Sequence, residues 1–111
     1  MSVEQLDVVD VISTDKSGQV VLTISDHLDW SNSEEHQTIL QAKLNKYLAF
    51  VESGELLTRY SDAKDRPVAI EVVFKYRPDQ SGWNFLAKAT AVIESAGFTL
   101  RHRVFAESYD N

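Results

Sequence analysis

The sequence predicts an α+β fold: a two-layer sandwich with the order ββαβαβ, in which a four-stranded mixed sheet carries two helices on one face. Apolar residues alternate in three segments, as in strands, and recur every three or four residues in two longer segments, as in helices. Each helical segment lies between two strand segments, and right-handed crossovers place both helices on the same face. No linker rich in Gly, Ser or Pro divides the 111 residues, so we expect a single domain, 1–111.

The first two strands form a predicted hairpin. Residues 5–14 are rich in β-branched side chains, which favour a strand. Residues 15–18 read Asp-Lys-Ser-Gly and have turn chemistry, with Gly18 suited to a positive φ. Residues 20–25 then alternate between two faces, which predicts a second strand antiparallel to the first.

A long amphipathic segment predicts the first helix, from about residue 32 to residue 53. Its apolar residues follow three- and four-residue spacing and form one stripe. Gly54 can end the helix, because glycine adopts the left-handed conformation without a Cβ penalty. Two pairs offer a capping box at the helix start: Ser31 with Glu34, and Asn32 with Glu35.

The second half of the chain predicts a strand, a helix and a final strand. Residues 68–76 alternate as a long strand that ends before Pro78, and residues 98–104 alternate as the last strand. Asp79 or Ser81 can cap the intervening helix, and Gly97 can end it. The predicted apolar face of this helix comprises Phe85, Leu86, Ala89, Val92, Ile93 and Ala96.

The predicted sheet has three parallel strands and one antiparallel strand. We favour the spatial order 2-1-3-4, with 1-2-3-4 as the alternative. The uncovered face would display Glu71, Lys75, Arg101 and Arg103, with Glu71 paired to Arg101 across two strands. Alternation turns His102 towards the helices, where we expect a buried, hydrogen-bonded side chain.

Composition excludes several classes of function. The chain has no Cys, which excludes disulfides, thiolate zinc sites and a cysteine nucleophile. A net charge of −6 argues against binding to nucleic acid or to an anionic membrane. No apolar run approaches the roughly 20 residues of a spanning helix, and the first residues do not resemble a signal peptide, so we expect a soluble cytoplasmic protein. Residues 1–56 hold ten acids and three bases, against seven and eight in residues 57–111.

The most unusual stretch runs from the end of the second strand into the first helix. It is acidic and contains a tryptophan, a residue type enriched among binding hot spots. We therefore interpret it as a binding surface for a basic protein, although helix capping alone accounts for many of the same residues. The predicted partner-binding residues are Asp26, His27, Asp29, Trp30, Glu34 and Glu35.

Two further hypotheses remain open. His27 and His36 with nearby carboxylates would suit a small metal-dependent enzyme or metal sensor, although their nine-residue spacing matches no compact ligand motif and no resident metal or cofactor is expected. A homodimer through an edge strand or the open sheet face would use Phe105 and Tyr109. The sequence lacks a GxSxG elbow, a glycine-rich phosphate loop and an HExxH motif, which favours a binding module over an enzyme.

Four segments carry a resemblance to a known family. They are VLTISDHLDW (21–30), YLAFVESGELL (47–57), VVFKYRP (72–78) and AVIESAGF (91–98). Together they resemble an uncharacterised family of small bacterial proteins, a domain of unknown function, over nearly the whole chain and in the same order. The resemblance implies a bacterial, cytosolic protein. It supplies no activity, catalytic residue or cofactor.

Overall fold

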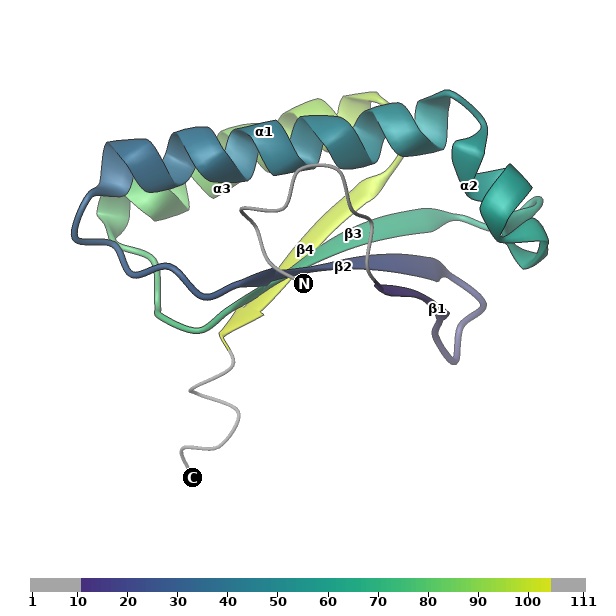
Figure 1. Ribbon diagram of the computed structural model, residues 1–111, viewed down its shortest axis with the longest axis horizontal. Coiled ribbons are helices and arrows are strands. Elements are labelled where there is room, and N and C mark those ends of the chain that lie inside the picture. The colour runs from purple at the N-terminus through teal and green to yellow at the C-terminus, as the bar shows by residue number, and fades with distance from the viewer. Residues whose placement is uncertain (1–10, 105–111) are drawn as a thin grey trace.

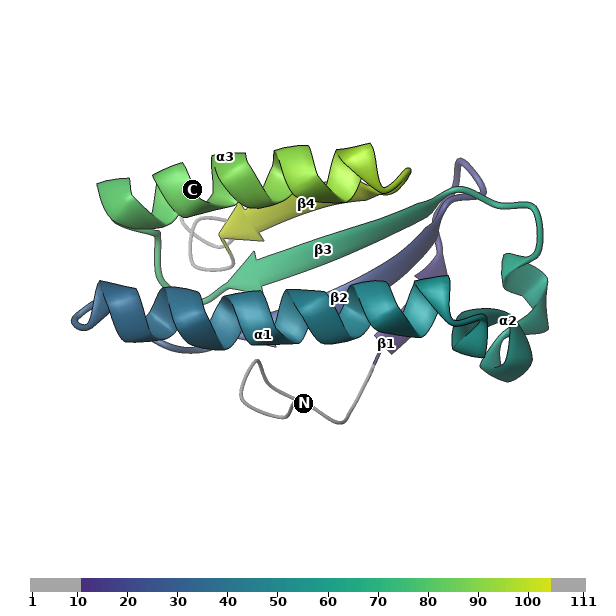
Figure 2. The same ribbon diagram turned by 90° about the horizontal axis from the view of Figure 1, so that it is seen from above.

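The computed structural model describes residues 11–104, which form two layers (Figure 1). The sheet is mixed: β1 runs antiparallel to β2, whereas β2, β3 and β4 are mutually parallel. Seen from above, α1 and α3 lie beside each other across one face of the sheet (Figure 2). This arrangement confirms the predicted α+β sandwich. The elements are β1 (Val11–Thr14), β2 (Val20–Asp26), α1 (Ser33–Glu52), α2 (Glu55–Arg59), the 3-10 helix η1 (Ser61–Ala63), β3 (Val68–Phe74), α3 (Gln80–Ser95) and β4 (Thr99–Val104).

The spatial order of the strands is β1-β2-β3-β4. The favoured order 2-1-3-4 was therefore wrong and its alternative right. Burial gives the physical reason: β2 is buried along most of its length, including Val20, Leu22 and Ile24, whereas Ile12 of β1 is half-buried. The strand with the more buried side chains therefore lies inside the sheet, where both of its edges are hydrogen-bonded, and β1 lies at the edge.

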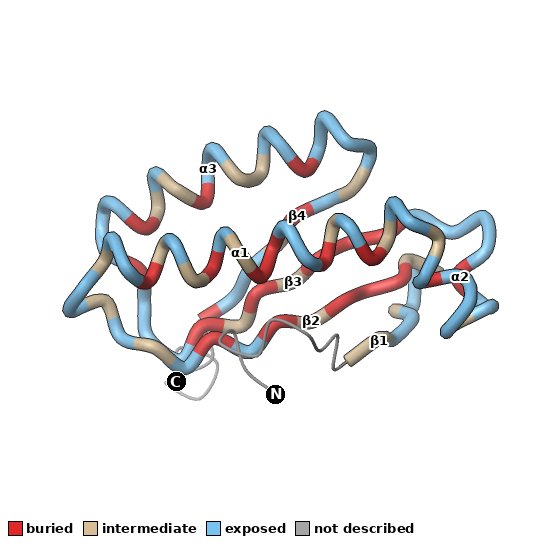
Figure 3. Tube along the Cα trace, turned by 45° about the horizontal axis from the view of Figure 1, so that its top comes forward, coloured by how far each residue is buried: buried red, intermediate tan, exposed pale blue. Residues whose placement is uncertain are grey.

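The core lies between the sheet and the helices. Along β2 and β3, every second side chain points at the helices and is almost completely buried, including Leu22, Ile24 and Val72. The buried positions of α1 face the strands (Figure 3). Leu40 and Tyr47 are fully buried there, and the Tyr47 hydroxyl donates to the Thr23 carbonyl at 3.1 Å. The core thus fixes the rotation of α1 over the sheet.

The ends of α1 follow the predicted signals. Asn32 is the N-cap, and its side-chain oxygen accepts from the Glu35 backbone N–H while its amide donates to the Glu35 carboxylate. Ser31 instead donates its hydroxyl to Asp29. Gly54 has a φ of +89° and ends the helix as predicted. The sequence did not predict α2, a five-residue helix that begins directly after Gly54.

The expectation of a buried, hydrogen-bonded His102 was wrong. The side chain faces the helix layer, where its ring lies 5.1 Å from Trp83 and 6.4 Å from Phe74. It is nevertheless exposed and makes no hydrogen bond with the described residues. The reason is that β4 is an edge strand, so Trp83 shields His102 on one side only.

The predicted third strand was too long, and the predicted apolar face of α3 was too wide. β3 ends at Phe74 rather than continuing to Tyr76, which is 45% exposed. Its ladder stops because β2 ends opposite Phe74, at Asp26, and leaves the sheet for α1. On α3, Leu86 and Ile93 are buried, whereas Val92 is 59% exposed and lines an open hollow between α3 and α1. Ala96 is also exposed.

Several other expectations have defined outcomes. The predicted pairing of Glu71 with Arg101 is confirmed, with Arg101 Nε 2.9 Å from Glu71 Oε1. The N-terminal half of the predicted first strand lies outside the described residues, and so do Phe105 and Tyr109 of the homodimer hypothesis. Within residues 11–104, none of the helices combines the length and apolarity that crossing a bilayer requires.

Candidate functional site

The candidate site lies where the parallel strands end and both long helices begin. Because β2 and β3 run in the same direction, α1 and α3 start at the same end of the sheet (Figure 1). Ser33 of α1 donates its hydroxyl to Asp79, the N-cap of α3, at 3.1 Å. Gln37 donates its amide to the Ser81 hydroxyl at 2.7 Å. The two helix starts are therefore tied directly to each other.

A buried Asp–His pair holds the β2–α1 connection in place. Asp26 and His36 are both only 2% exposed, and His36 Nε2 lies 2.6 Å from Asp26 Oδ2. The second carboxylate oxygen of Asp26 accepts from the Leu28 backbone N–H at 3.1 Å. His36 Nδ1 donates to the Asp29 carbonyl at 2.9 Å. Every polar atom of the pair thus has a partner, as burial requires.

The hydrogen-bond pattern also determines the charge of the pair. A carbonyl oxygen only accepts, so the bond to Asp29 requires a proton on His36 Nδ1. The short contact between Nε2 and Asp26 contains one further proton. Whether this proton resides on the imidazole or on the carboxyl group, the two side chains together are electrically neutral. Neutrality is what makes their burial tolerable, because an isolated buried charge costs several kcal/mol.

Trp30 covers His36 on the outer side. Their ring centroids are 3.7 Å apart with a 24° interplanar angle, and the indole N–H donates to the Tyr76 carbonyl at 3.2 Å. A Cβ on Gly82 would lie 2.8 Å from the Trp30 ring and 3.0 Å from Pro78 Cβ. Only glycine fits at this position, so α3 packs directly onto the Trp30 ring.

The structure divides the six predicted partner-binding residues into two groups. Asp26 is buried within its pair with His36, so it does not contribute to an exposed surface, and Trp30 is half-buried against His36. The remaining four, His27, Asp29, Glu34 and Glu35, are exposed. We call Asp29, Glu34 and Glu35 the acidic rim. None of these three carboxylates has a Lys or Arg partner within residues 11–104.

A hollow of about 350 Å³ lies beside the acidic rim. Asp29 and Glu35 line it from the loop and from the first turn of α1, and Tyr76 lines it from the segment that follows β3. His36 forms part of its wall, although both of its ring nitrogens are already hydrogen-bonded. Sequence reasoning considered His36 only as a metal ligand, not as the buried partner of Asp26, and it placed Tyr76 in a strand rather than at this site. For His36 the available signal was its position four residues before Leu40 on the buried stripe of the helix.

Asp29 is held in the ionised form by its own loop. The Ser31 hydroxyl donates to Asp29 Oδ1 at 2.7 Å, and the Ser31 backbone N–H donates to the same oxygen at 3.1 Å. These bonds, the hydroxyl first, hold the pKa of Asp29 below its usual value. Because the pKa of Asp29 is lower in the folded chain than in the unfolded chain, its ionised carboxylate stabilises the fold at pH values above the ordinary Asp pKa. This stabilisation is lost as the pH falls through the lowered pKa of the folded chain.

The metal hypothesis finds no ligand set in the described part of the chain. Residues 11–104 contain no group of three His, Asp or Glu side chains arranged to hold a metal ion. His36 uses Nδ1 for the Asp29 carbonyl and Nε2 for Asp26, so neither nitrogen is available as a ligand. His27 lies on the exposed loop and is not brought together with His36 in such a group.

Comparison with family models places nearly the whole chain in one family. A family of unknown function, DUF6572, matches residues 1–106. The chain belongs to this family. The match confirms the resemblance to an uncharacterised family that the four sequence segments carry, and it assigns no activity to any residue. Searches of curated proteins and of solved structures found no match.

Replacing Gly82 with alanine should destabilise the protein, although the same change in an open helix is favourable by about 1 kcal/mol. The new methyl group would press on the Trp30 ring, which His36 and the Tyr76 carbonyl hold in place. We expect the free energy of unfolding in urea to fall by about 1–3 kcal/mol. In a Trp30→Phe background the smaller ring should reduce this loss, and an equal loss would show that the ring is not the obstacle.

Replacing Asp26 with alanine should lower the free energy of unfolding by about 3–5 kcal/mol, because it leaves His36 Nε2 buried without a partner. Asp26→Asn should cost less, since its amide can accept from Leu28 and donate to His36. Urea denaturation followed by circular dichroism measures both, with the exposed Asp62→Ala as control. A cost for Asp26→Ala no larger than that of the control would contradict the role of the pair.

Replacing Ser31 with alanine should raise the pKa of Asp29 towards its usual value, because the hydroxyl donor disappears. The backbone N–H of residue 31 remains, so the rise should be partial. Carboxyl carbon chemical shifts across a pH titration measure the pKa directly. Ser33→Ala is the matched control, because that hydroxyl donates to Asp79, and it should leave the Asp29 titration unchanged.

Proposed function

We propose that this protein is a non-enzymatic binding module whose acidic rim binds a basic surface on another protein. The observation that supports this is the exposure of three carboxylates, Asp29, Glu34 and Glu35, without a Lys or Arg partner among the described residues. Two of the three line the hollow at the start of α1. A basic partner would supply the opposite charge and a side chain to enter the hollow.

Helix capping explains only part of the acidic rim. Glu35 serves in the capping box with Asn32, and Asp29 closes a turn with Ser31. The side chain of Glu34, by contrast, makes no hydrogen bond or ion pair within residues 11–104. All three carboxylates interact favourably with the positive end of the helix dipole at the start of α1. Opposite charge on a partner would add to this through faster association and stronger discrimination between partners.

Hydrogen bonds hold the loop that carries Asp29 of the acidic rim in one conformation, which favours binding. The carbonyl of Asp29 accepts from His36, and its carboxylate accepts two bonds from Ser31, so this loop is fixed before a partner arrives. Trp30, which lies between Asp29 and Ser31 in the sequence, packs on the His36 ring. A surface that is already ordered loses less conformational entropy on association, so more of the contact energy contributes to affinity.

The test replaces the rim carboxylates with their amides, Asp29→Asn, Glu34→Gln and Glu35→Gln. Amides preserve the Asx turn and the capping box, so the fold is maintained while three negative charges disappear. The matched control, Glu52→Gln, Glu55→Gln and Asp62→Asn, removes the same charge from exposed positions at the opposite end of α1.

Two measurements compare these variants. Titration with a lysine-rich peptide at low salt should shift the amide resonances of residues 29–35, and added salt should weaken the binding. We expect the rim variant to bind at least about tenfold more weakly, and the control to bind like the parent protein. Affinity capture from the native host should yield a basic protein that the rim variant no longer retains. Equal binding by rim and control variants would overturn the proposal.

A further inference from the structure

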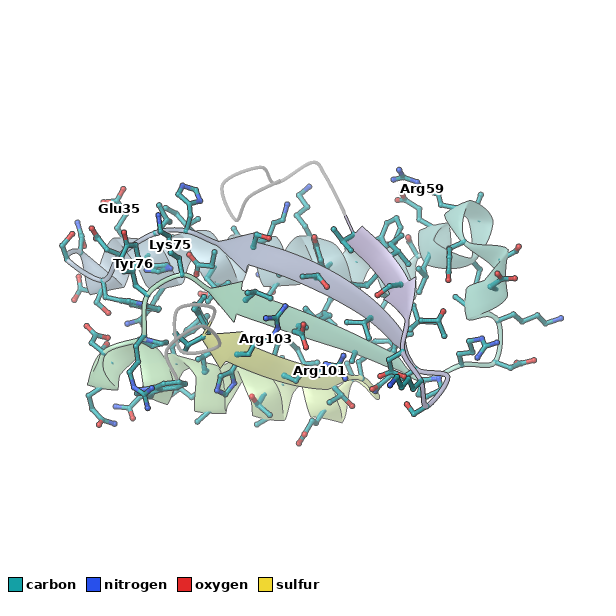
Figure 4. All side chains as sticks on the ribbon, turned by 90° about the horizontal axis from the view of Figure 1, so that it is seen from below. Glu35, Arg59, Lys75, Tyr76, Arg101 and Arg103 are labelled. Carbon is teal, nitrogen blue, oxygen red and sulfur yellow. The ribbon has the colours of Figure 1, made fainter. Side chains whose placement is uncertain are left out.

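The uncovered face of the sheet is organised in lateral rows of side chains. In the parallel register, Thr23, Glu71 and Arg101 form one row across β2, β3 and β4. The next row towards the strand ends consists of Ser25, Val73 and Arg103. Figure 4 views this face, with Lys75, Arg103 and Arg101 labelled along it. In the first row the side chain of Arg101 extends across the neighbouring strand, whereas in the second row the side chain of Arg103 does not.

The row of Arg101 is closed by charge pairing. Arg101 Nε lies 2.9 Å from Glu71 Oε1, and one terminal guanidinium nitrogen lies 3.4 Å from both Asp15 Oδ2 and Gln19 Oε1. Arg101 thus extends from β4 across β3 to the β1–β2 turn. Ala69 faces the same side of the sheet and is completely buried. This part of the uncovered face has no room for a ligand.

The row of Arg103 leaves a hollow of about 370 Å³, a volume at the small end of the range for ligand pockets. Val73 lies between Ser25 and Arg103 in the register and provides an apolar floor. Thr23 and Ser25 contribute hydroxyl groups on the β2 side. The hollow is therefore apolar at its base and bordered by hydrogen-bonding groups.

Two cationic side chains border this hollow. Arg103 and Lys75 both line it: Arg103 is the register partner of Val73, and Lys75 follows Val73 by two residues, directly after the end of β3. Arg103 directs only Nε towards Glu71, at 3.4 Å, and its other N–H donors have no hydrogen-bond partner within residues 11–104. Lys75 forms no ion pair in that part of the chain. Both cations can therefore bind one added anionic group.

We propose that this basic hollow binds a small organic anion, in which a carboxylate or phosphate group is attached to a short apolar body. The anionic oxygens would lie between Arg103 and Lys75, because a guanidinium and an ammonium together match an oxyanion. The apolar body would lie on Val73, with the Ser25 hydroxyl at its edge. This site is separate from the acidic rim and opposite in charge, so it stands independently of the proposed function.

The charge balance of the hollow supports this ligand class. Asp26, at the end of β2, also lines the hollow. Together with His36 it forms an electrically neutral pair, so it does not repel an anion. Glu71 has both oxygens occupied by arginine Nε atoms, one from Arg101 and one from Arg103. Neither acid adds an unpaired negative charge, whereas Lys75 and the outer part of Arg103 retain their positive charge.

The experiment titrates the full chain with four probes and follows backbone amide resonances. Benzoate and phenyl phosphate carry both an anion and an apolar body, benzamide carries the body alone, and inorganic phosphate carries the anion alone. We expect benzoate or phenyl phosphate to shift the resonances of residues 23–27, 73–75 and 103 with saturation below about 10 mM. Comparing the two shows which oxyanion is preferred. Benzamide and inorganic phosphate should bind at least about tenfold more weakly.

A double variant tests the assigned cations. Lys75→Gln with Arg103→Gln should weaken benzoate or phenyl phosphate binding at least about tenfold, whereas the exposed pair Lys46→Gln with Lys64→Gln should leave it unchanged. Thermal melting confirms that each variant folds. Should the double variant not fold, the four probes on the parent protein decide. Absence of saturable shifts, equal binding of benzamide, equal binding of inorganic phosphate, or equal losses in both variants would each overturn the proposal.

Discussion

The hydrogen bond between Asp26 and His36 is the interaction on which the rest of this end of the molecule depends. It joins the last residue of β2 to the first turn of α1 inside the core, at 2.6 Å and with both side chains buried. His36 in turn positions the Asp29 carbonyl and supports the ring of Trp30. Trp30 then sets how closely α3 approaches, since only glycine fits at residue 82. One neutral polar pair thus orients the loop, α1 and α3.

Two surfaces of opposite charge meet beside this pair. The acidic rim lies on the helix side, and the basic hollow lies on the uncovered face of the sheet, with His27 lining the hollow on each side. Five of the seventeen acidic residues lie in residues 1–10 and 105–111, which contain no Lys or Arg. The described part of the chain is therefore close to neutral. Local arrangement, rather than total charge, determines what each surface can bind.

Local signals predicted the features that depend on near neighbours. The capping box of Asn32 with Glu35 and the positive φ of Gly54 each follow from a few adjacent residues. Contacts between distant segments were not predictable in the same way. Nothing in the spacing of Asp26 and His36 reveals that they form a buried pair, and the contact of Trp30 with Gly82 requires α1 and α3 to be placed first. The exposure of His102 follows from β4 being an edge strand, which periodicity alone does not show.

The reach of Arg101 across the sheet has a consequence for how the molecule comes apart. Its guanidinium joins the last strand to the turn between the first two, over 86 positions of sequence to Asp15. Edge strands in small sheets commonly open first and independently, since each has only one hydrogen-bonded neighbour. Here detachment of β4 also breaks the contacts of Arg101 with Asp15 and Gln19. One side chain thus adds a small cost to the fraying of this edge that its own strand ladder does not provide.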